Sequence, residues 1–270
     1  MPHSVINMSE YRVSTYDTNC NSYERLREAL GGRGIRPPPS DYRYQPNDCI
    51  INWGSTGARD YPIHVNQPSA VNTSTHKLLS FQAFDRANVP YPIYTRDREV
   101  AKMWVADNHI VYARSTENGC RGQGIQVITP GSPMADNFPY ALFYTKRFPG
   151  DREFRVYTMR DKVLQVYEKK DLDQKGLDPL VRASEDWYYC KENLAPYILN
   201  IEAYAIEATK AVGLDFSGVD VLVDSNTDDV CILEVNSAPW LGTGTAMKLA
   251  NAIKSYFPIP MIDSREGISL

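Results

Sequence analysis

Several stretches of the chain repeat apolar residues at spacings that are typical of regular secondary structure. One apolar stripe recurs every three or four residues and predicts a helix that ends at Gly213. Its members are Ile198, Ile201, Ala205, Ala208 and Val212. Two more helices are predicted, one from Ser74 to the break before Pro90 and one over residues 246–257.

The first part of the chain predicts a small α/β unit. A helix should begin at Asn21, with Glu24 at the reciprocal capping position, and should end at Gly31 and Gly32. Residues 48–54 form a short apolar run that ends in a glycine, which is typical of a buried strand before a turn.

Short apolar strands joined by tight turns are predicted further along the chain. Residues 111–115 and 125–128 predict two strands joined by a glycine-rich loop, and residues 141–144 predict a third. Residues 154–159 and 162–167 predict a hairpin. Helices mixed with several hairpins indicate an α+β or α/β fold with antiparallel sheets.

Composition and charge exclude several classes of protein. The chain has 270 residues, which is enough for two or three small domains. Hydrophobic residues make up 43% and charged residues 23%, as in ordinary globular proteins. The net charge is −4, from 29 basic and 33 acidic residues, which argues against an extended nucleic-acid surface. No apolar run approaches the length of about 18 residues that a membrane span needs.

The cysteines and the start of the chain predict a cytoplasmic protein. Five cysteines are scattered along the sequence without a C-x-x-C pair, which argues against both a disulfide framework and a zinc site. The first ten residues lack the basic and apolar segments of a secretory signal.

The predicted strands over residues 217–224 and 230–235 form an acidic hairpin. If the turn is centred on Thr227, symmetric pairing places Asp220 directly opposite Glu234. The same register pairs residue 222 with 232 and residue 224 with 230.

Two carboxylates that lie opposite each other on neighbouring strands repel, so something must compensate for them. Asn236 follows two residues after Glu234 on the same face. Carboxylate and amide oxygens suit Mg²⁺, so Asp220, Glu234 and Asn236 are candidate metal ligands. An exposed acidic face with the register shifted by one residue is the alternative.

A second candidate site is the glycine-rich loop at residues 119–124. A dinucleotide fingerprint or a Walker loop opens a helix, whereas a strand follows here, so neither motif applies. Successive glycine N–H groups can still converge on an anion, with Arg114 and Arg121 adding positive charge. The alternative is a plain hairpin tip.

Charged residues also alternate on the strands of the predicted hairpin. Glu153 and Arg155 share one face of their strand, and Glu168 and Lys170 share a face of the next. Such residues are usually solvated ion pairs, and Lys77 alone would be a surface lysine.

Taken together and in this order, these residues resemble the ATP-grasp ligases. The resemblance runs from about Asn66 to Gly244, and its strongest piece is the pair of segments 214–220 and 233–239. It is nearest to the RimK-like branch, the ribosomal-protein glutamate ligases that join amino acids to the carboxyl end of a peptide or protein.

The resemblance implies the ATP-grasp fold in three parts. These are a small amino-terminal α/β domain at residues 1–72, a central lid with the glycine-rich loop at residues 73–147, and a carboxy-terminal subdomain with the metal-binding hairpin at residues 148–270.

The resemblance also assigns site residues. Asp220, Glu234 and Asn236 would hold Mg²⁺, and Arg155 and Lys170 would stabilise the transferred phosphoryl group. Lys77 and Arg114 would face the nucleotide phosphates, and Lys146 and Phe148 would belong to the adenine hinge. Glu153 would lie at the ribose end. The loop over the triphosphate would include Gly119, Arg121, Gly122, Gln123 and Gly124.

The implied activity is an ATP-dependent carboxylate–amine ligation through an acyl-phosphate, with two Mg²⁺ ions for which Mn²⁺ could substitute. The acceptor could be a peptide, a protein or a small carboxylate, and the enzyme could be a homodimer or a homotetramer. The alternatives are a phosphotransferase of the same fold and a non-catalytic nucleotide-binding module.

Overall fold

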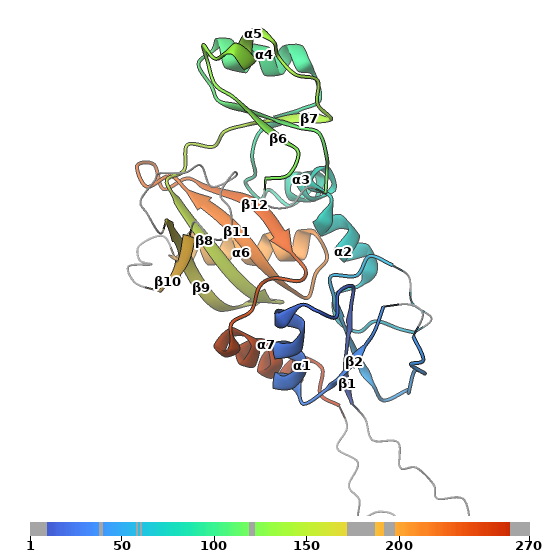
Figure 1. Ribbon diagram of the computed structural model, residues 1–270. Helices are drawn as coiled ribbons and strands as arrows, with labels where there is room; N and C mark the ends of the chain where they lie inside the picture. Colours follow the sequence, from blue (N-terminus) through green and yellow to red (C-terminus); the bar gives the residue numbers. More distant parts are fainter. Residues whose placement is uncertain are drawn as a thin grey trace, which may run out of the picture.

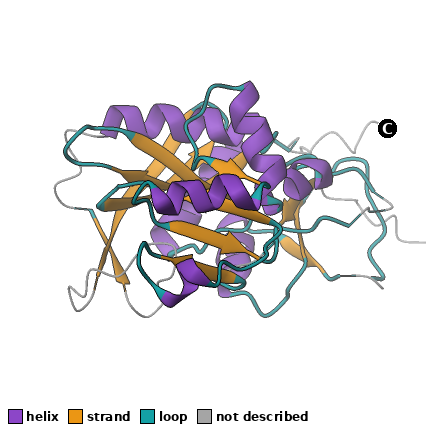
Figure 2. Ribbon diagram, turned by 90° about the horizontal axis from the view of Figure 1, so that it is seen from above, coloured by secondary structure: helices purple, strands orange, loops and turns teal. Residues whose placement is uncertain are grey.

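The computed structural model describes residues 10–37, 40–57, 59, 61–118, 122–171, 187–191 and 198–259. Within these ranges the strands form three sheets, which lie one above another in Figure 1. Seen from above in Figure 2, helices lie along the outside of the strands. No helix in these ranges is both long enough and apolar enough to cross a bilayer.

The N-terminal unit is a three-stranded parallel sheet in the order β2-β1-β3. Its elements are β1 (Tyr11–Thr15), α1 (Asn21–Leu30), β2 (Arg33–Ile35) and β3 (Cys49–Trp53). The last helix of the chain, α7 (Thr243–Tyr256), packs against this unit, because its buried apolar residues share one core with those of α1.

The helix α1 begins and ends where the sequence predicts, but its first turn is held differently. The capping residue is Cys20, whose side chain makes no capping hydrogen bond, so the expected reciprocal cap at Glu24 is wrong. Glu24 instead pairs with Arg27 at 2.7 Å. Gly31 ends the helix with φ +67°, a left-handed conformation that favours glycine.

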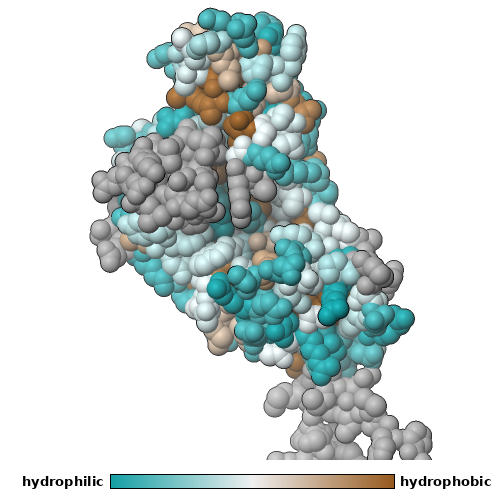
Figure 3. Space-filling view, viewed as in Figure 1, coloured by the Kyte–Doolittle hydropathy of each residue, from teal (hydrophilic) through white to brown (hydrophobic). Residues whose placement is uncertain are grey.

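The lid is a four-stranded antiparallel sheet in the order β4-β7-β5-β6. Its strands are β4 (Tyr94–Thr95), β5 (Val111–Arg114), β6 (Ile125–Ile128) and β7 (Phe143–Lys146). The helices α4 (Arg98–Ala106) and α5 (Pro133–Asp136) accompany it, and neither was predicted from the sequence. In Figure 3 hydrophobic residues gather on the lower part of the lid, where it meets the rest of the molecule.

The central sheet has five antiparallel strands in the order β10-β9-β8-β11-β12. They are β8 (Arg152–Met159), β9 (Lys162–Asp171), β10 (Trp187–Cys190), β11 (Phe216–Val223) and β12 (Val230–Asn236). One face carries the largest core of the described chain, with α6 (Ile198–Ala211), α2 (Pro68–Thr75) and α3 (Lys77–Arg86) packed against it. The helix expected from Ser74 is therefore two helices, which break at His76.

The packing crosses the expected domain boundaries at 72 and 147 in two places. The residues of α3 lie in the expected lid but join the core of the central sheet. The residues of α7 lie in the expected third part but pack on the N-terminal unit. The hydrophobic cores are therefore shared across the expected boundaries, and the division into three domains stays a prediction.

Asn66, where the resemblance begins, contacts Asp215 at the start of its strongest segment, although 149 residues separate them. The Asn66 side chain accepts hydrogen bonds from the N–H groups of Asp215 (2.8 Å) and Phe216 (3.1 Å). The N–H of Asn66 donates to the Asp215 carboxylate at 2.9 Å. These contacts fix the start of β11 relative to the segment that leads into α2.

A β-bulge changes the register of the acidic hairpin. Asp220 pairs with Glu234, as the sequence predicts, but residues 221 to 223 pair with 232 to 230. The expected pairs 222–232 and 224–230 are therefore wrong by one residue. The extra residue of β12 places Leu233 and Glu234 on the face opposite the core, because the bulge lets two residues oppose one.

Candidate active site

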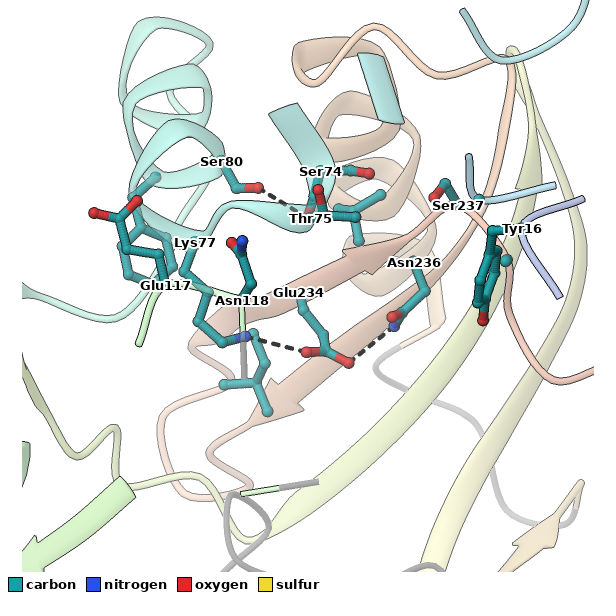
Figure 4. Close-up of a pocket in the computed structure, with 15 residues that line it drawn as sticks. Tyr16, Ser74, Thr75, Lys77, Ser80, Glu117, Asn118, Glu234, Asn236 and Ser237 are labelled. Atoms are coloured by element: carbon teal, nitrogen blue, oxygen red, sulfur yellow. Dashed lines mark hydrogen bonds and ion pairs between the residues drawn. The ribbon is translucent and has the colours of Figure 1, made fainter. Parts of the chain in front are cut away.

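A cavity of about 320 Å³ opens between the end of β12, the junction of α2 and α3, and the N-terminal unit. Figure 4 shows its polar lining, with Lys77, Glu234 and Asn236 side by side. Glu117 and Asn118, from the loop after β5, also line the cavity, so four distant parts of the sequence contribute to it.

The three candidate metal ligands lie together. The amide nitrogen of Asn236 donates to Glu234 at 2.9 Å and to Asp220 at 3.4 Å. The Lys77 ammonium, at the start of α3, lies 3.1 Å from the other Glu234 oxygen. The expected acidic cluster is thus assembled, with a lysine as its counter-charge.

Asp220 also belongs to a buried charge network on the central sheet. Arg155 on β8 forms two hydrogen bonds with the Asp220 carboxylate, at 2.6 and 2.8 Å. Lys169 on β9 lies 2.7 Å from Asp220 and also pairs with Glu153. All four residues are less than a tenth exposed, so each charge depends on the others for its stability.

Neighbouring charges control ionisation in this cluster. Burial would raise the pKa of Glu234, but Lys77, Asn236 and Arg155 together hold that pKa well below its usual range. Burial would lower the pKa of Arg155, yet Asp220 keeps it well above the ordinary value. Both side chains are therefore charged in the folded protein.

Gly218 allows the loop after β12 to approach the sheet. A Cβ atom at this position would lie 2.5 Å from the Cβ of Pro239 and 3.3 Å from the Cδ of Arg155. The Gly-Val-Asp order of β11 thus has a packing reason, since only glycine leaves room for the loop beside Arg155.

The lid supplies further expected residues. Arg114, at the end of β5, is buried and its Nε donates to the Thr145 hydroxyl at 3.2 Å. Burial lowers the pKa of Arg114 to about 10, against the opposing effect of Glu234. Gly122 and Gly124 both have φ +73° in the turn between β5 and β6.

The structure describes three more of the residues expected in the loop and the adenine hinge. Gln123 lies exposed between those two glycines, whereas Gly119 and Arg121 lie outside the described residues. The backbone N–H of Lys146 bonds to the Ile93 carbonyl at 2.9 Å. Phe148 packs against a small apolar cluster on the outer face of the hairpin, made of Leu222, Cys231 and Leu233.

Glu153 was expected at the ribose end, but its carboxylate pairs with buried Lys169. Trp240, in the loop after β12, is not among the residues that line the cavity, and it packs against Tyr189 and Arg25. The ribose contact of Glu153 stays a prediction.

The expectation that Lys170 faces the site is wrong. Residues 153 and 155 of β8 pair with residues 169 and 167 of β9, and directly paired residues share a face. Lys170 therefore lies on the other face, 3.5 Å from Glu168. A bulge after Tyr157 causes this, because a slip of one residue exchanges the two faces of a strand.

We expect Lys169→Met to lower activity by at least about 100-fold, because it removes a charge that touches Asp220. Lys170→Met should lower activity less than about threefold, because Lys170 lies on the other face and its partner Glu168 keeps a second ion pair with Arg152. Initial rates of ADP release from the two purified variants check this. Equal losses in both would contradict the assignment of the two faces.

The donor set suits Mg²⁺. Two facing carboxylates with one amide leave the remaining positions of a six-coordinate ion to water and phosphate oxygens. In the structure Asn236 turns its nitrogen toward the carboxylates, and a half-turn of the amide would present its oxygen instead. Among the described residues, no group of three or more His, Cys, Asp and Glu side chains that could hold a metal is found, and the candidate set here is two carboxylates and an amide.

The three sheets, with the acidic hairpin in the central one and an antiparallel lid above it, form the ATP-grasp fold, as solved structures confirm. The chain superimposes on the ATP-grasp ligase PsnB, solved with a minimal precursor, with a TM-score of 0.65 and 14% identity over 92% of this chain and 99% of that one. It superimposes on D-alanyl-alanine synthetase A from Vibrio cholerae with a TM-score of 0.60 and 14% identity over 93% and 94%.

A comparison of sequences also finds one curated relative. The tetrahydromethanopterin:alpha-L-glutamate ligase of Methanocaldococcus jannaschii is 24% identical over 201 residues, 66% of this chain. The match spans 63% of the length of that curated relative. No protein-family model matches the chain.

Proposed function

We propose that the protein is an ATP-dependent ligase that joins a carboxylate to an amine. The observation that carries the proposal is the arrangement of three cations, Lys77, Arg155 and Lys169, around the hairpin carboxylates beside an open cavity. Such an arrangement can bind a triphosphate and balance charge as it moves during phosphoryl transfer.

The reaction would take place in two steps. An oxygen of the substrate carboxylate attacks the γ-phosphorus of ATP, and ADP leaves, which gives an acyl-phosphate. The amine then attacks the acyl carbon, loses a proton and expels phosphate, so that an amide forms. No side chain acts as a nucleophile, so the protein's task is to position the reactants and balance their charge.

The chain's own residues would have distinct tasks in these steps. Lys77 would neutralise the phosphates from the start of α3, and Arg155 would stabilise the transferred phosphoryl group as its contact with Asp220 loosens. Buried Arg114 would add charge from the lid. Mg²⁺, which Asp220, Glu234 and Asn236 would hold, supplies charge neutralisation on the phosphate oxygens when bound. Two ions, with Mn²⁺ as a substitute, are part of the proposal.

The relatives suggest where to begin with substrates. One is named as an L-glutamate ligase, and another was solved in complex with a precursor peptide. We therefore propose an amino acid as the amine, and a peptide, a protein or a small molecule as the carboxylate. By resemblance alone, the proposal includes a homodimer or a homotetramer, and light scattering tests the assembly. A cytoplasmic location is proposed from the scattered cysteines.

An assay of ADP release with ATP, Mg²⁺, pooled amino acids and pooled carboxylates tests the proposal. Release that requires both a carboxylate and an amine would support ligation. A stable phosphorylated product without an amine would instead indicate a phosphotransferase. ATP binding with no release for any pair would indicate a non-catalytic module.

A further inference from the structure

A second and larger cavity, of about 570 Å³, lies on the N-terminal unit between α1 and β2. The strand β2 is at the edge of its sheet, with β1 as its neighbour. Among the described residues, none lines both this cavity and the one beside Glu234. In Figure 1 the N-terminal unit lies at the opposite end of the molecule from the lid. The cavity is therefore separate from the site assigned to ATP.

The hydroxyl group of Tyr23 opens into this cavity. Tyr23 and Gly34 both line it, and a Cβ atom at Gly34 would overlap the Tyr23 hydroxyl. Only glycine therefore leaves room for this hydroxyl over β2. Tyr23 is 4% exposed, and among the described residues its hydroxyl has no hydrogen-bond partner, although it is not one of their fully buried polar atoms. A ligand in the cavity can thus reach it.

The lining of the cavity carries a net positive charge. Three arginines line it, Arg27, Arg33 and Arg36, against one carboxylate, that of Glu24. Arg27 pairs with Glu24 at 2.7 Å, and Arg33 pairs at 3.3 Å with Glu10, which lies outside the lining. Arg36 is exposed and has no acidic partner among the described residues. Its guanidinium group is therefore left for a ligand.

Two of these guanidinium groups lie near the Tyr23 hydroxyl. Burial, and less strongly Glu24, raise the pKa of Tyr23, while the charges of Arg27 and Arg36 oppose the rise. The phenol therefore keeps its hydrogen and can donate it. The Cδ atom of Arg27 would lie 3.7 Å from a Cβ at Gly34, so Arg27 crosses the same part of β2 as the hydroxyl. The three donors converge on one side of the cavity.

This set of donors suits a phosphate group. A guanidinium group has only donors, and its planar fork matches phosphate and carboxylate oxygens. Arg27 uses Nε and Nη2 on Glu24, which leaves Nη1 for a ligand. A phosphate has three terminal oxygens and can accept from both guanidinium groups and the phenol at once, whereas a carboxylate has two. The volume of about 570 Å³ falls within the range of about 300–1,000 Å³ that is typical of small-molecule sites.

We propose that this cavity binds a small ligand that carries a phosphate group, which accepts hydrogen bonds from Arg27, Arg36 and the Tyr23 hydroxyl. The site goes beyond the proposed ligase function and does not depend on it, because the two cavities use different residues.

Titration of the full chain with sodium phosphate at constant ionic strength tests the proposal, with thermal shift as the measure of binding. Arg36→Gln and Tyr23→Phe each remove one donor that has no partner among the described residues, so both variants should fold. Arg43→Gln is the matched control. It removes the same charge from an exposed arginine of the same unit that does not line the cavity.

We expect phosphate to stabilise the wild type and Arg43→Gln at the same concentrations. In Arg36→Gln and in Tyr23→Phe, the concentration for half-maximal stabilisation should rise about tenfold, as for a lost hydrogen bond to a charged group. Glutarate, a dicarboxylate, should need a higher concentration than phosphate in the wild type. Lys77→Gln, in the other cavity, should respond to phosphate as the wild type does.

Four results would overturn the proposal. The first is a wild type that phosphate does not stabilise. The second is an equal effect of Arg36→Gln and Arg43→Gln, because net charge alone would then explain the binding. The third is a loss of the response in Lys77→Gln, which would place the phosphate in the other cavity. The fourth is glutarate that binds as tightly as phosphate, which would assign the site to carboxylates.

Discussion

The Glu234→Gln variant is expected to lose at least about 100-fold of the proposed ligase activity while it keeps its fold. The amide has the same shape as the carboxylate but no charge, so the proposed metal site loses a charged ligand and Lys77 loses its charged partner. The Glu234 side chain is 39% exposed, and such ion pairs contribute about 1 kcal/mol or less to stability. Activity and stability should therefore separate.

Rates of ADP release and thermal unfolding measure the two effects. The melting temperature should fall by less than about 4 °C, the shift that about 1 kcal/mol causes in a chain of this size. Glu207→Gln is the matched control, because this carboxylate is 52% exposed on α6 and pairs only locally with Lys210. Full activity of Glu234→Gln would contradict the proposed site.

The second large effect is expected for Asp220→Asn, which should lose both activity and stability. Asp220 is 4% exposed and balances the charges of Arg155 and Lys169. Without that charge, Arg155 loses the carboxylate that holds it by two hydrogen bonds, and Lys169 loses one of its two carboxylate partners. Removing one partner of a buried ion pair costs about 3–5 kcal/mol, which corresponds to a fall of about 10 °C in melting temperature.

Comparison of the two hairpin variants by thermal unfolding checks this prediction. The structure predicts that Asp220→Asn is the less stable of the pair, although the two carboxylates face each other and carry the same charge. Asp224→Asn, one residue after the end of β11, is a further control, because its carboxylate accepts hydrogen bonds from Asn226 in the adjacent turn. Equal melting temperatures for Asp220→Asn and wild type would show that the network does not stabilise the fold.

Two bulges, each of one residue, explain why the sequence predicted one cross-strand pairing correctly and placed one basic residue on the wrong face of its strand. Symmetric pairing about Thr227 places Asp220 opposite Glu234. In the structure, the pairs nearest the turn are shifted by one residue, and the bulge in β12 reverses this shift before the pair of Asp220 and Glu234. On β9 the expected face was that of Lys170, and the bulge after Tyr157 exchanges it for Lys169. Alternation along a strand gives its two faces, but a bulge depends on the neighbouring strand.

The sequence alone determined local structure, because apolar periodicity, glycines and turn residues act over a few positions. It predicted α6 up to Gly213, the hairpin at Arg160 and the facing carboxylates Asp220 and Glu234. Its motif order also led to the ATP-grasp fold, which the solved structures confirm.

Only the tertiary structure decided which charges meet. The contacts of Lys77 with Glu234, of Arg155 with Asp220 and of Asn66 with Asp215 join residues 65 to 157 positions apart. No local pattern encodes such pairs, because each depends on how the sheets and helices pack.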